Sequence, residues 1–440
     1  MKRKKWFYFI FSVLLLLPAF YVIVKQYIDS YFYLGDLGAY CAISRALFEG
    51  NIPFPDHFEY LFCYSHGGSV VPIVYPGQML LFLIPAYLPD FISIIAGRPD
   101  RWFRAIHLVY FFSNIVGVFF LIGLTYVKGM SWRWCDLYTP DRKQLIYALS
   151  CSLAFYSCSF KESLRWGQIP IVLAICFYCM FWGPVSSCLR TVLFALIALL
   201  KYSVLPVVAP LLFLKGHWKL CLAAFSVFLF FTISPVFCGN DLVELYTEYS
   251  NAVQLILQPG HLNHYDRVPD GMCHFAFFKI GFINYFLRAL AVCVILWLFW
   301  RERKTPYLSD TLLLSAFCLT MLVSYHRIYD LVLAYPLFVI RLYDFAGKKQ
   351  WSLFGITLLF PLFLCLPSSW LFVDIPACFG HIPRADSIVY LCYRIKGLSL
   401  FPIMPFFMTA LTFWSLYLYF HVKEPYRFVL SGTRKNDSKE

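Results

Sequence analysis

Long runs of uncharged, mostly apolar residues alternate along this chain with short polar segments. The first run, residues 6–24, follows the basic residues Lys2, Arg3, Lys4 and Lys5. A helix of this length can cross about 30 Å of hydrocarbon. Because no small-residue cleavage site follows the run, the pattern predicts a retained signal anchor with its N-terminus in the cytoplasm.

The later runs predict further membrane helices. The run 191–214 is interrupted at Lys201 and Pro206, so we expect two short helices that meet at Lys201 on the outer side. Segment 74–88 begins near YPGQ and has two further prolines nearby, Pro85 within it and Pro89 directly after it. It could cross the membrane, but the prolines and the charge distribution favour a juxtamembrane or re-entrant helix. The other predicted spans are 105–127, 145–160, 169–189, 220–240, 289–300, 311–325, 331–340, 352–373 and 397–422.

Together these runs predict an all-α polytopic membrane protein with about 12 transmembrane helices, in a single integral membrane domain over residues 1–440. Four polar segments are expected on the extracytoplasmic side: a large loop at 28–104 with juxtamembrane helices, a short segment at 161–168, and smaller loops at 241–284 and 374–396. The sequence shows no inverted duplication of broken helices, which many transporters have.

Composition agrees with this class. Hydrophobic residues make up 60% of the chain and charged residues 14%, whereas a soluble domain has about 25% charged residues. The predicted topology puts 22 of the 37 Lys and Arg on the cytoplasmic side, but only 8 of the 24 Asp and Glu. The positive-inside rule thus explains the net charge of +13, and we expect membrane lipid but no nucleic acid as a partner.

Most of the sixteen cysteines lie in apolar runs, where they serve as small apolar residues. Cys176 and Cys179 form a C-x-x-C pattern inside such a run, without a nearby His or acid, which disfavours a metal site. We therefore expect no metal and no cofactor. A disulfide among the outer cysteines is possible, but the sequence does not determine its pairing. These are Cys41, Cys63, Cys273, Cys378 and Cys392.

Several charged and polar residues are predicted at one membrane face, the outer one. Ionisable residues at or within a bilayer are costly and mark functional sites. Their common location predicts one active site, in which Asp36 and His326 are the catalytic candidates. The other candidates are Glu162, Arg165, Gln168, Lys201, Arg327, Asp330, Arg384 and Asp386.

Each candidate also has a structural interpretation. Asp36 could cap the helix that begins at LGAY, and Lys201 could extend to the membrane interface. His326 could be a hydrogen-bonded core histidine. Glu162 and Arg165 could form an ordinary surface pair at positions i and i+3.

The residue types suit sugar transfer at the membrane surface. A carboxylate can take the proton from an acceptor hydroxyl, which gives Asp36 the role of general base. Lys201, Arg165 and His326 can stabilise a departing phosphate. A lipid-phosphate donor fits such a site because its hydrocarbon tail stays in the bilayer.

Four stretches, in order, resemble glycosyltransferase family 87, a family of the GT-C class. The first, DLGAYCAISRALFEGNIPF (36–54), resembles the family's acid, Tyr and Leu-x-x-Gly-x-x-Pro pattern. The second, VYPGQMLLFLIP (74–85), resembles its Tyr-Pro-Pro stretch. The third is LRWGQIPIVLAI (164–175), with LLKYSVLP (199–206) like the later Lys-x-x-Pro. The fourth is SYHRIYDLVLAYPL (324–337).

This resemblance implies a GT-C-like fold and an inverting transfer, without metal, from a polyprenyl-phosphate sugar, with mannose favoured. It implies that Tyr75 joins Lys201, Arg165 and Gln168 at the donor, while Glu162, Arg327, Asp330 and Arg384 support the site or the acceptor. Two positions depart from the family pattern: Gly77 replaces the second proline of the Tyr-Pro-Pro stretch, and Pro170 stands where Asn is frequent.

Two other classes remain open at this point. One is a membrane transporter or a flippase for lipid-linked glycans, and the other is an O-antigen polymerase or ligase. The enzyme reading predicts a multi-pass protein of the plasma or inner membrane. It would transfer a hexose or pentose to a lipid or glycan acceptor of the cell envelope, at an extracytoplasmic active site.

Overall fold

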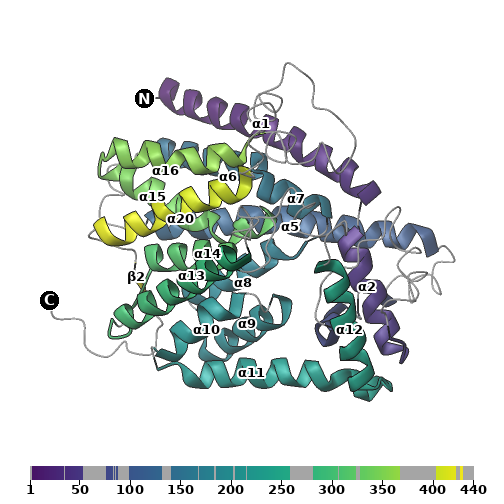
Figure 1. The fold of residues 1–440 in the computed structure, drawn as a ribbon. Coiled ribbons are helices and arrows are strands. Elements are labelled where there is room, and N and C mark those ends of the chain that lie inside the picture. Colours follow the sequence, from purple (N-terminus) through teal and green to yellow (C-terminus); the bar gives the residue numbers. More distant parts are fainter. Residues whose placement is uncertain are drawn as a thin grey trace, which may run out of the picture.

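The computed structural model describes residues 2–33, 35–52, 76–82, 84, 86–87, 99–130, 140–166, 168–182, 185–201, 204–214, 216–257, 281–305, 307–323, 328–366, 403–422 and 427–429. The described residues form helices and one pair of short strands (Figure 1). The predicted helical fold class is therefore confirmed for this part of the chain.

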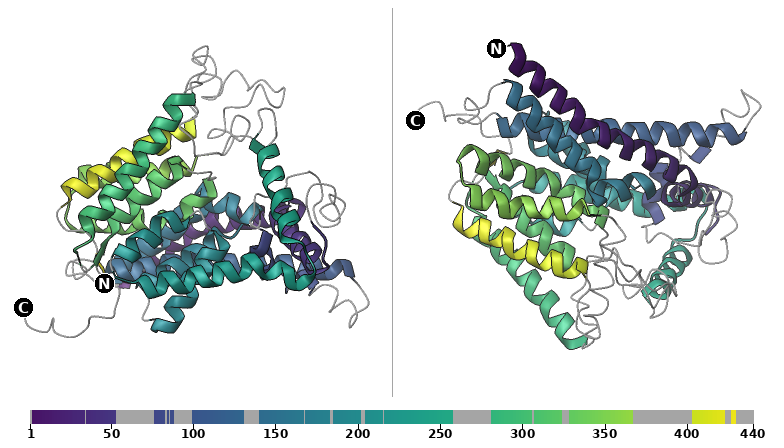
Figure 2. Two further views of the ribbon diagram at one scale, coloured as in Figure 1. Left: turned by 60° about the horizontal axis from the view of Figure 1, so that its bottom comes forward. Right: turned by 90° about the horizontal axis from the view of Figure 1, so that it is seen from above.

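The described residues of the N-terminal half form ten α-helices and two short 3₁₀ helices. Helix α1 lies across the outside of the bundle, against α6 (Figures 1 and 2). Their bounds are α1 Lys2–Tyr33, α2 Gly35–Phe48, η1 Pro76–Phe82, α5 Pro99–Met130, α6 Pro140–Tyr156, α7 Cys158–Trp166, α8 Pro170–Trp182, α9 Ser187–Leu200, α10 Leu205–Leu214, α11 Trp218–Ile233, η4 Ser234–Cys238 and α12 Leu242–Leu257.

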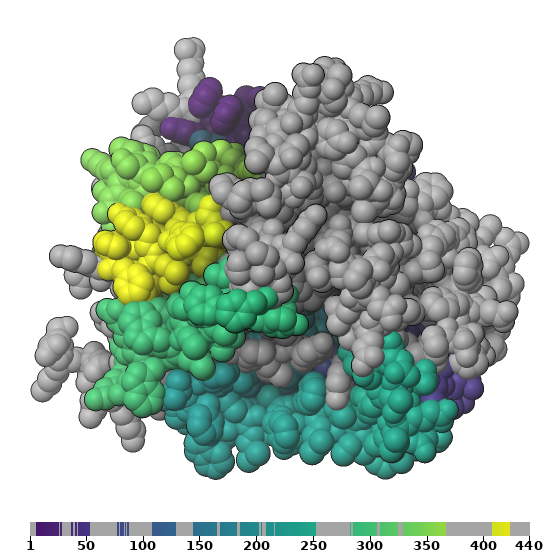
Figure 3. Space-filling model, in the orientation of Figure 1, coloured from purple at the N-terminus to yellow at the C-terminus, as the bar shows by residue number. Residues whose placement is uncertain are grey.

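The C-terminal half forms a second group of helices, whose outer members lie side by side in the space-filling view (Figure 3). Strand β1 pairs antiparallel with β2 and so joins the segment after α13 to the segment after α20. The bounds are α13 Gly281–Glu302, β1 Tyr307–Ser309, α14 Asp310–Val323, η5 Ile328–Leu333, α15 Tyr335–Gly347, α16 Trp351–Leu364, α20 Ile403–His421 and β2 Arg427–Val429.

Helices α8, α14 and α15 form the centre of the bundle. Residues 310–322 of α14 and 335–345 of α15 are buried on every side, as expected of helices that are surrounded by others. By contrast α1, α11 and α13 expose large apolar side chains such as Phe20, Phe225 and Trp297. Extended apolar surfaces of this kind are stable against lipid rather than water.

Within the described part of the chain, three helical segments are long and apolar enough to cross a membrane: Trp6–Lys25, Leu108–Lys128 and Trp218–Cys238. Together with the exposed apolar faces they identify a membrane protein. Five shorter apolar helices of 10–17 residues accompany them among the described residues. The total of about twelve spans stays a prediction.

Two predicted runs differ in their internal structure. The run 145–160 is divided at Ser157, between α6 and α7, although it contains neither Pro nor a charge at that point. The break at Lys201 is confirmed, because α9 ends at Leu200 and α10 begins at Leu205. Pro206 lies in the first turn of α10, where proline is tolerated, and does not make a second break.

Segment 74–88 contains the seven-residue helix η1. At about 2.0 Å per residue, this element is too short to span a bilayer. Its location relative to the membrane, and the extracytoplasmic location of 28–104, stay predictions. Loops 241–284 and 374–396 fall largely outside the described residues, apart from α12.

Candidate active site

Helix α2 carries the predicted base. It begins at Gly35, so Asp36 lies in its first turn rather than at the capping position before it. An acid in the first turn still favours the helix through the macrodipole. The side chain of Asp36 lies outside the described residues, but Tyr40, one turn further along, is buried and described.

Tyr40 connects this helix to the third family-like stretch. Its hydroxyl donates a hydrogen bond to Oε1 of Gln168, at 3.3 Å. Gln168 lies two residues before the start of α8 at Pro170, and its backbone carbonyl accepts a hydrogen bond from the hydroxyl of Tyr110 on α5. The helix that carries Asp36 is therefore linked, through Tyr40, to Gln168, which lies 128 positions after Tyr40 in the sequence.

Helix η1, in the second family-like stretch, also contacts Tyr40. The rings of Phe82 and Tyr40 are 5.1 Å apart between centroids, and Gln78 is buried in the same helix. Tyr75, the predicted donor contact, lies outside the described residues. Three of the four family-like stretches thus meet around Tyr40.

Gly77 explains how η1 is fixed. A Cβ atom at this position would lie 1.9 Å from the carbonyl oxygen of Phe231, on α11. The two backbones are therefore in direct contact, which only glycine permits here. The family pattern has a proline at this position. Because proline carries a Cβ, it would not fit against the carbonyl of Phe231, whereas Gly77 does.

We expect Gly77→Ala to lower the melting temperature and to reduce activity, because η1 must move away from α11 and carry its contacts with α2 along. Overpacking of this kind costs about 1–3 kcal/mol. Gly123→Ala on α5 is the matched control, since no atom lies within 4 Å of its added Cβ. Thermal unfolding in detergent compares the two, and equal melting temperatures would contradict the close contact.

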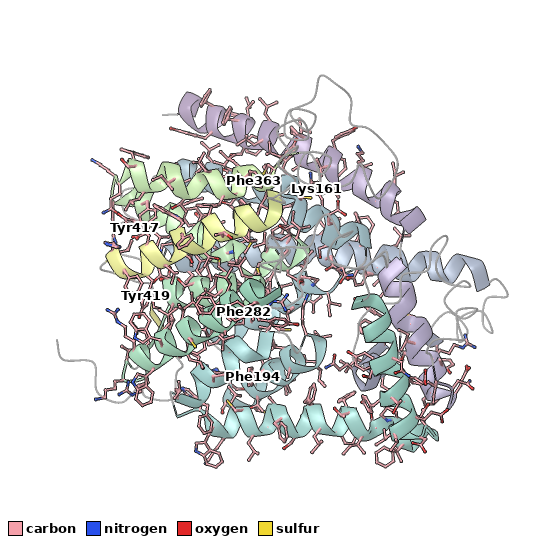
Figure 4. All side chains as sticks on the ribbon, viewed as in Figure 1. Lys161, Phe194, Phe282, Phe363, Tyr417 and Tyr419 are labelled. Carbon is pink, nitrogen blue, oxygen red and sulfur yellow. The ribbon has the colours of Figure 1, made fainter. Side chains whose placement is uncertain are left out.

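Helix α7 holds two further candidates. Glu162 is 7% exposed, so the interpretation of Glu162 and Arg165 as an ordinary surface pair is wrong for Glu162. Arg165 lies on the same helix, but its side chain is outside the described residues. Lys161, labelled in Figure 4, marks the location of α7. This helix packs against both α2 and η5, and so lies between the two groups of candidate residues.

Lys201 and Asp330 form an ion pair between Nζ and Oδ1. Lys201 directly follows α9, where its backbone N–H donates to the carbonyl of Ile197. Asp330 belongs to η5, which Tyr178 of α8 holds by a hydrogen bond to the carbonyl of Leu333. Lys201 therefore has a specific carboxylate partner, which the interpretation as an interfacial lysine did not predict.

The structure thus brings together Gln168 with the helix of Asp36, and Lys201 with Asp330. His326, Arg327, Arg384 and Asp386 fall outside the described residues. Sequence reasoning missed Tyr40 and Tyr110 as site residues. The signal for Tyr40 was its spacing of four from Asp36, which places both on one face of a helix.

A separate charged cluster lies at the other end of the bundle. Arg341 on α15 is fully buried and pairs with both oxygens of Asp310, and its Nη1 donates to Asp344 at 3.2 Å. Asp344 also pairs with Lys348 at 3.0 Å. Asp310 begins α14, whose 14 residues span about 21 Å, so Asp310 is remote from the other end of that helix at Val323.

The long apolar helices define a membrane protein, and its candidate site contains a buried amide, Gln168, and a lysine paired with a carboxylate. Residues 74–324, or 251 of 440, match glycosyltransferase family 87, and the chain belongs to that family. It is therefore a glycosyltransferase. The matched region includes Glu162, Arg165, Gln168 and Lys201, whereas Asp36 lies before it. No curated protein and no solved structure matches the chain significantly.

Proposed function

We propose that this enzyme transfers a hexose or pentose, with mannose favoured, from a polyprenyl-phosphate donor to a lipid or glycan acceptor, with inversion at the anomeric carbon. The observation that carries the proposal is the hydrogen bond from Tyr40 to Gln168. It joins the helix of Asp36, the proposed base, to the third family-like stretch (164–175), which lies in the family-matched region.

The proposed reaction is a single displacement. Asp36 accepts the proton from the acceptor hydroxyl as its oxygen attacks the anomeric carbon. The bond between that carbon and the phosphate oxygen breaks, and polyprenyl phosphate leaves. Lys201 and Arg165 bind the phosphate and stabilise its developing charge, with His326 assisting, while Tyr75 and Gln168 contact the donor.

The remaining candidates surround these groups in the proposed site. Glu162 is buried on α7 and Asp330 is paired with Lys201, so both are assigned supporting roles. Arg327 and Arg384 are assigned to the acceptor. Membership of a glycosyltransferase family favours this proposal over a transporter, a flippase or an O-antigen polymerase or ligase.

A donor comparison tests the proposal. Purified protein in detergent is mixed with a membrane glycolipid fraction and either radiolabelled polyprenyl-phosphate mannose or the corresponding nucleotide sugar. We expect label to enter the acceptor only from the lipid-phosphate donor, with release of polyprenyl phosphate and inverted configuration in the product. Transfer from the nucleotide sugar alone would refute the proposed donor class.

The proposed location of the site outside the cytoplasm gives a labelling prediction. Cys188 is exposed at the start of α9, and Lys201 follows the end of that helix. The 14 residues of α9 separate them by about 21 Å. With Lys201 on the outer side, we expect a membrane-impermeant maleimide to modify Cys188 in inside-out vesicles but not in right-side-out vesicles.

Cys41 is the control for this experiment. It is buried on α2, and burial raises the pKa of its thiol to about 12. Since maleimides react with the thiolate, Cys41 should stay unmodified in both vesicle orientations near neutral pH. Mass spectrometry of the two peptides reads out both sites, and modification of Cys188 from the outer side would reverse the proposed topology.

A further inference from the structure

The ion pair between Lys201 and Asp330 joins two irregular segments of backbone. Lys201 lies between α9 and α10, and Asp330 lies in the 3₁₀ helix η5. The residues are 129 positions apart. Backbone that is not α-helical occurs at membrane depth where it is buried in protein or lines a cavity, so this pair occupies the kind of place where a membrane enzyme binds its ligand.

The two partners differ in exposure. The side chain of Asp330 is 1% exposed and that of Lys201 is 20% exposed. The carboxylate is thus fixed inside the protein, while part of the lysine reaches the surface. An ammonium group has three N–H donors, so it can bind Asp330 and an oxygen atom of a ligand at the same time.

Stability alone gives a weak reason for such a pair. The free-energy cost of removing both charges from water offsets much of their attraction. A protein with well-packed apolar residues in place of such a pair is often equally stable. The pair of Asp344 and Lys348 is a useful comparison, since its exposures of 1% and 25% are similar. Those residues are neighbours on one helical segment, whereas Lys201 and Asp330 hold two distant segments together.

We propose that Asp330 is a positioning residue, which holds the ammonium group of Lys201 where it binds the phosphate of the lipid-linked donor. This inference rests on the proposed function and adds a role for Asp330 that acts through Lys201. Asp330 itself contacts neither the sugar nor the acceptor. Its loss should weaken donor binding and leave the acceptor KM unchanged.

Polyprenyl phosphate, the leaving group without its sugar, is the binding probe. Titrated into the purified protein in detergent, it should bind Asp330→Asn about ten- to a hundredfold more weakly than the wild type, because the charge-assisted hydrogen bond that holds Lys201 is replaced by a weaker bond to a neutral amide oxygen. The donor KM should rise in parallel. Asp344→Asn is the matched control, and should bind the probe like the wild type.

A charge exchange separates positioning from stability. The double variant Lys201→Asp with Asp330→Lys can form the same pair in the opposite direction. We expect it to regain the melting temperature lost by Asp330→Asn, but not the affinity for polyprenyl phosphate, because the cation now starts from η5. This variant also provides the test if Asp330→Asn does not fold.

Recovery of both stability and affinity in the double variant would overturn the inference, as would unchanged probe affinity in Asp330→Asn. Failure of the proposed function gives a different result. In that case the wild-type protein already fails to bind polyprenyl phosphate and to transfer sugar from a polyprenyl-phosphate donor. The result is then the same before any residue is substituted.

Discussion

Asp36→Asn is expected to reduce sugar transfer by about 10²–10⁴-fold, the usual effect of losing a general base. Asparagine has nearly the same shape as aspartate but cannot accept the proton of the acceptor hydroxyl. Donor binding should be retained, because the groups assigned to the phosphate are unchanged. The initial rate of polyprenyl phosphate release measures the effect, and binding of polyprenyl phosphate provides the comparison.

Asp241 offers a control for the helix-end role of an acid. Its Oδ1 accepts hydrogen bonds from the backbone N–H groups of Val243 at 2.7 Å and Glu244 at 3.2 Å, at the start of α12. Asp241→Ala should cost about 1 kcal/mol of stability without a comparable loss of transfer. Near-wild-type transfer by Asp36→Asn would exclude Asp36 as the base and leave it a favourable charge at the start of α2.

The sequence predicted those features that depend on local patterns. Apolar runs predicted the helices, because an amphipathic or apolar period is a property of neighbouring residues. The interruption at Lys201 was predicted because a charge and a nearby proline disrupt an otherwise apolar run. The break at Ser157 has no such local signal, since the residues around it are uncharged and contain no proline.

Contacts between distant segments could not be predicted in the same way. The hydrogen bond from Tyr40 to Gln168 and the ion pair of Lys201 with Asp330 join residues more than 120 positions apart. The sequence placed their segments at one membrane face, but it did not determine which side chains pair. Those partners depend on how α2 packs against the segment before α8, and η5 against the segment after α9.

Charge counting also could not distinguish a solvated charge from a buried one. Tyr419, labelled in Figure 4, donates to Oε1 of Glu302 at 2.8 Å in a partly exposed setting. Arg341 is also counted among the cytoplasmic charges, yet it is fully buried between Asp310 and Asp344. Its environment follows from the packing of α14 against α15, which the sequence pattern does not show.

That burial makes Arg341→Leu the substitution with the largest expected effect on stability. The change leaves Asp310 without its bidentate partner and Asp344 without one of its two cations. Breaking a buried pair by removing one partner costs about 3–5 kcal/mol, because the remaining charge is uncompensated. The melting temperature in detergent should therefore fall sharply, whereas Lys304→Gln, at an exposed lysine, should change stability by less than about 0.5 kcal/mol.

A triple variant tests whether compensation of charge is the cause. Asp310→Asn and Asp344→Asn, added to Arg341→Leu, remove the two carboxylates that lose the guanidinium group in the single variant. We expect the triple variant to melt at a higher temperature than Arg341→Leu, because replacing a whole buried charge network is less costly than breaking it. A triple variant that melts no higher than the single one would show that lost packing of the arginine side chain, and not its charge, causes the instability.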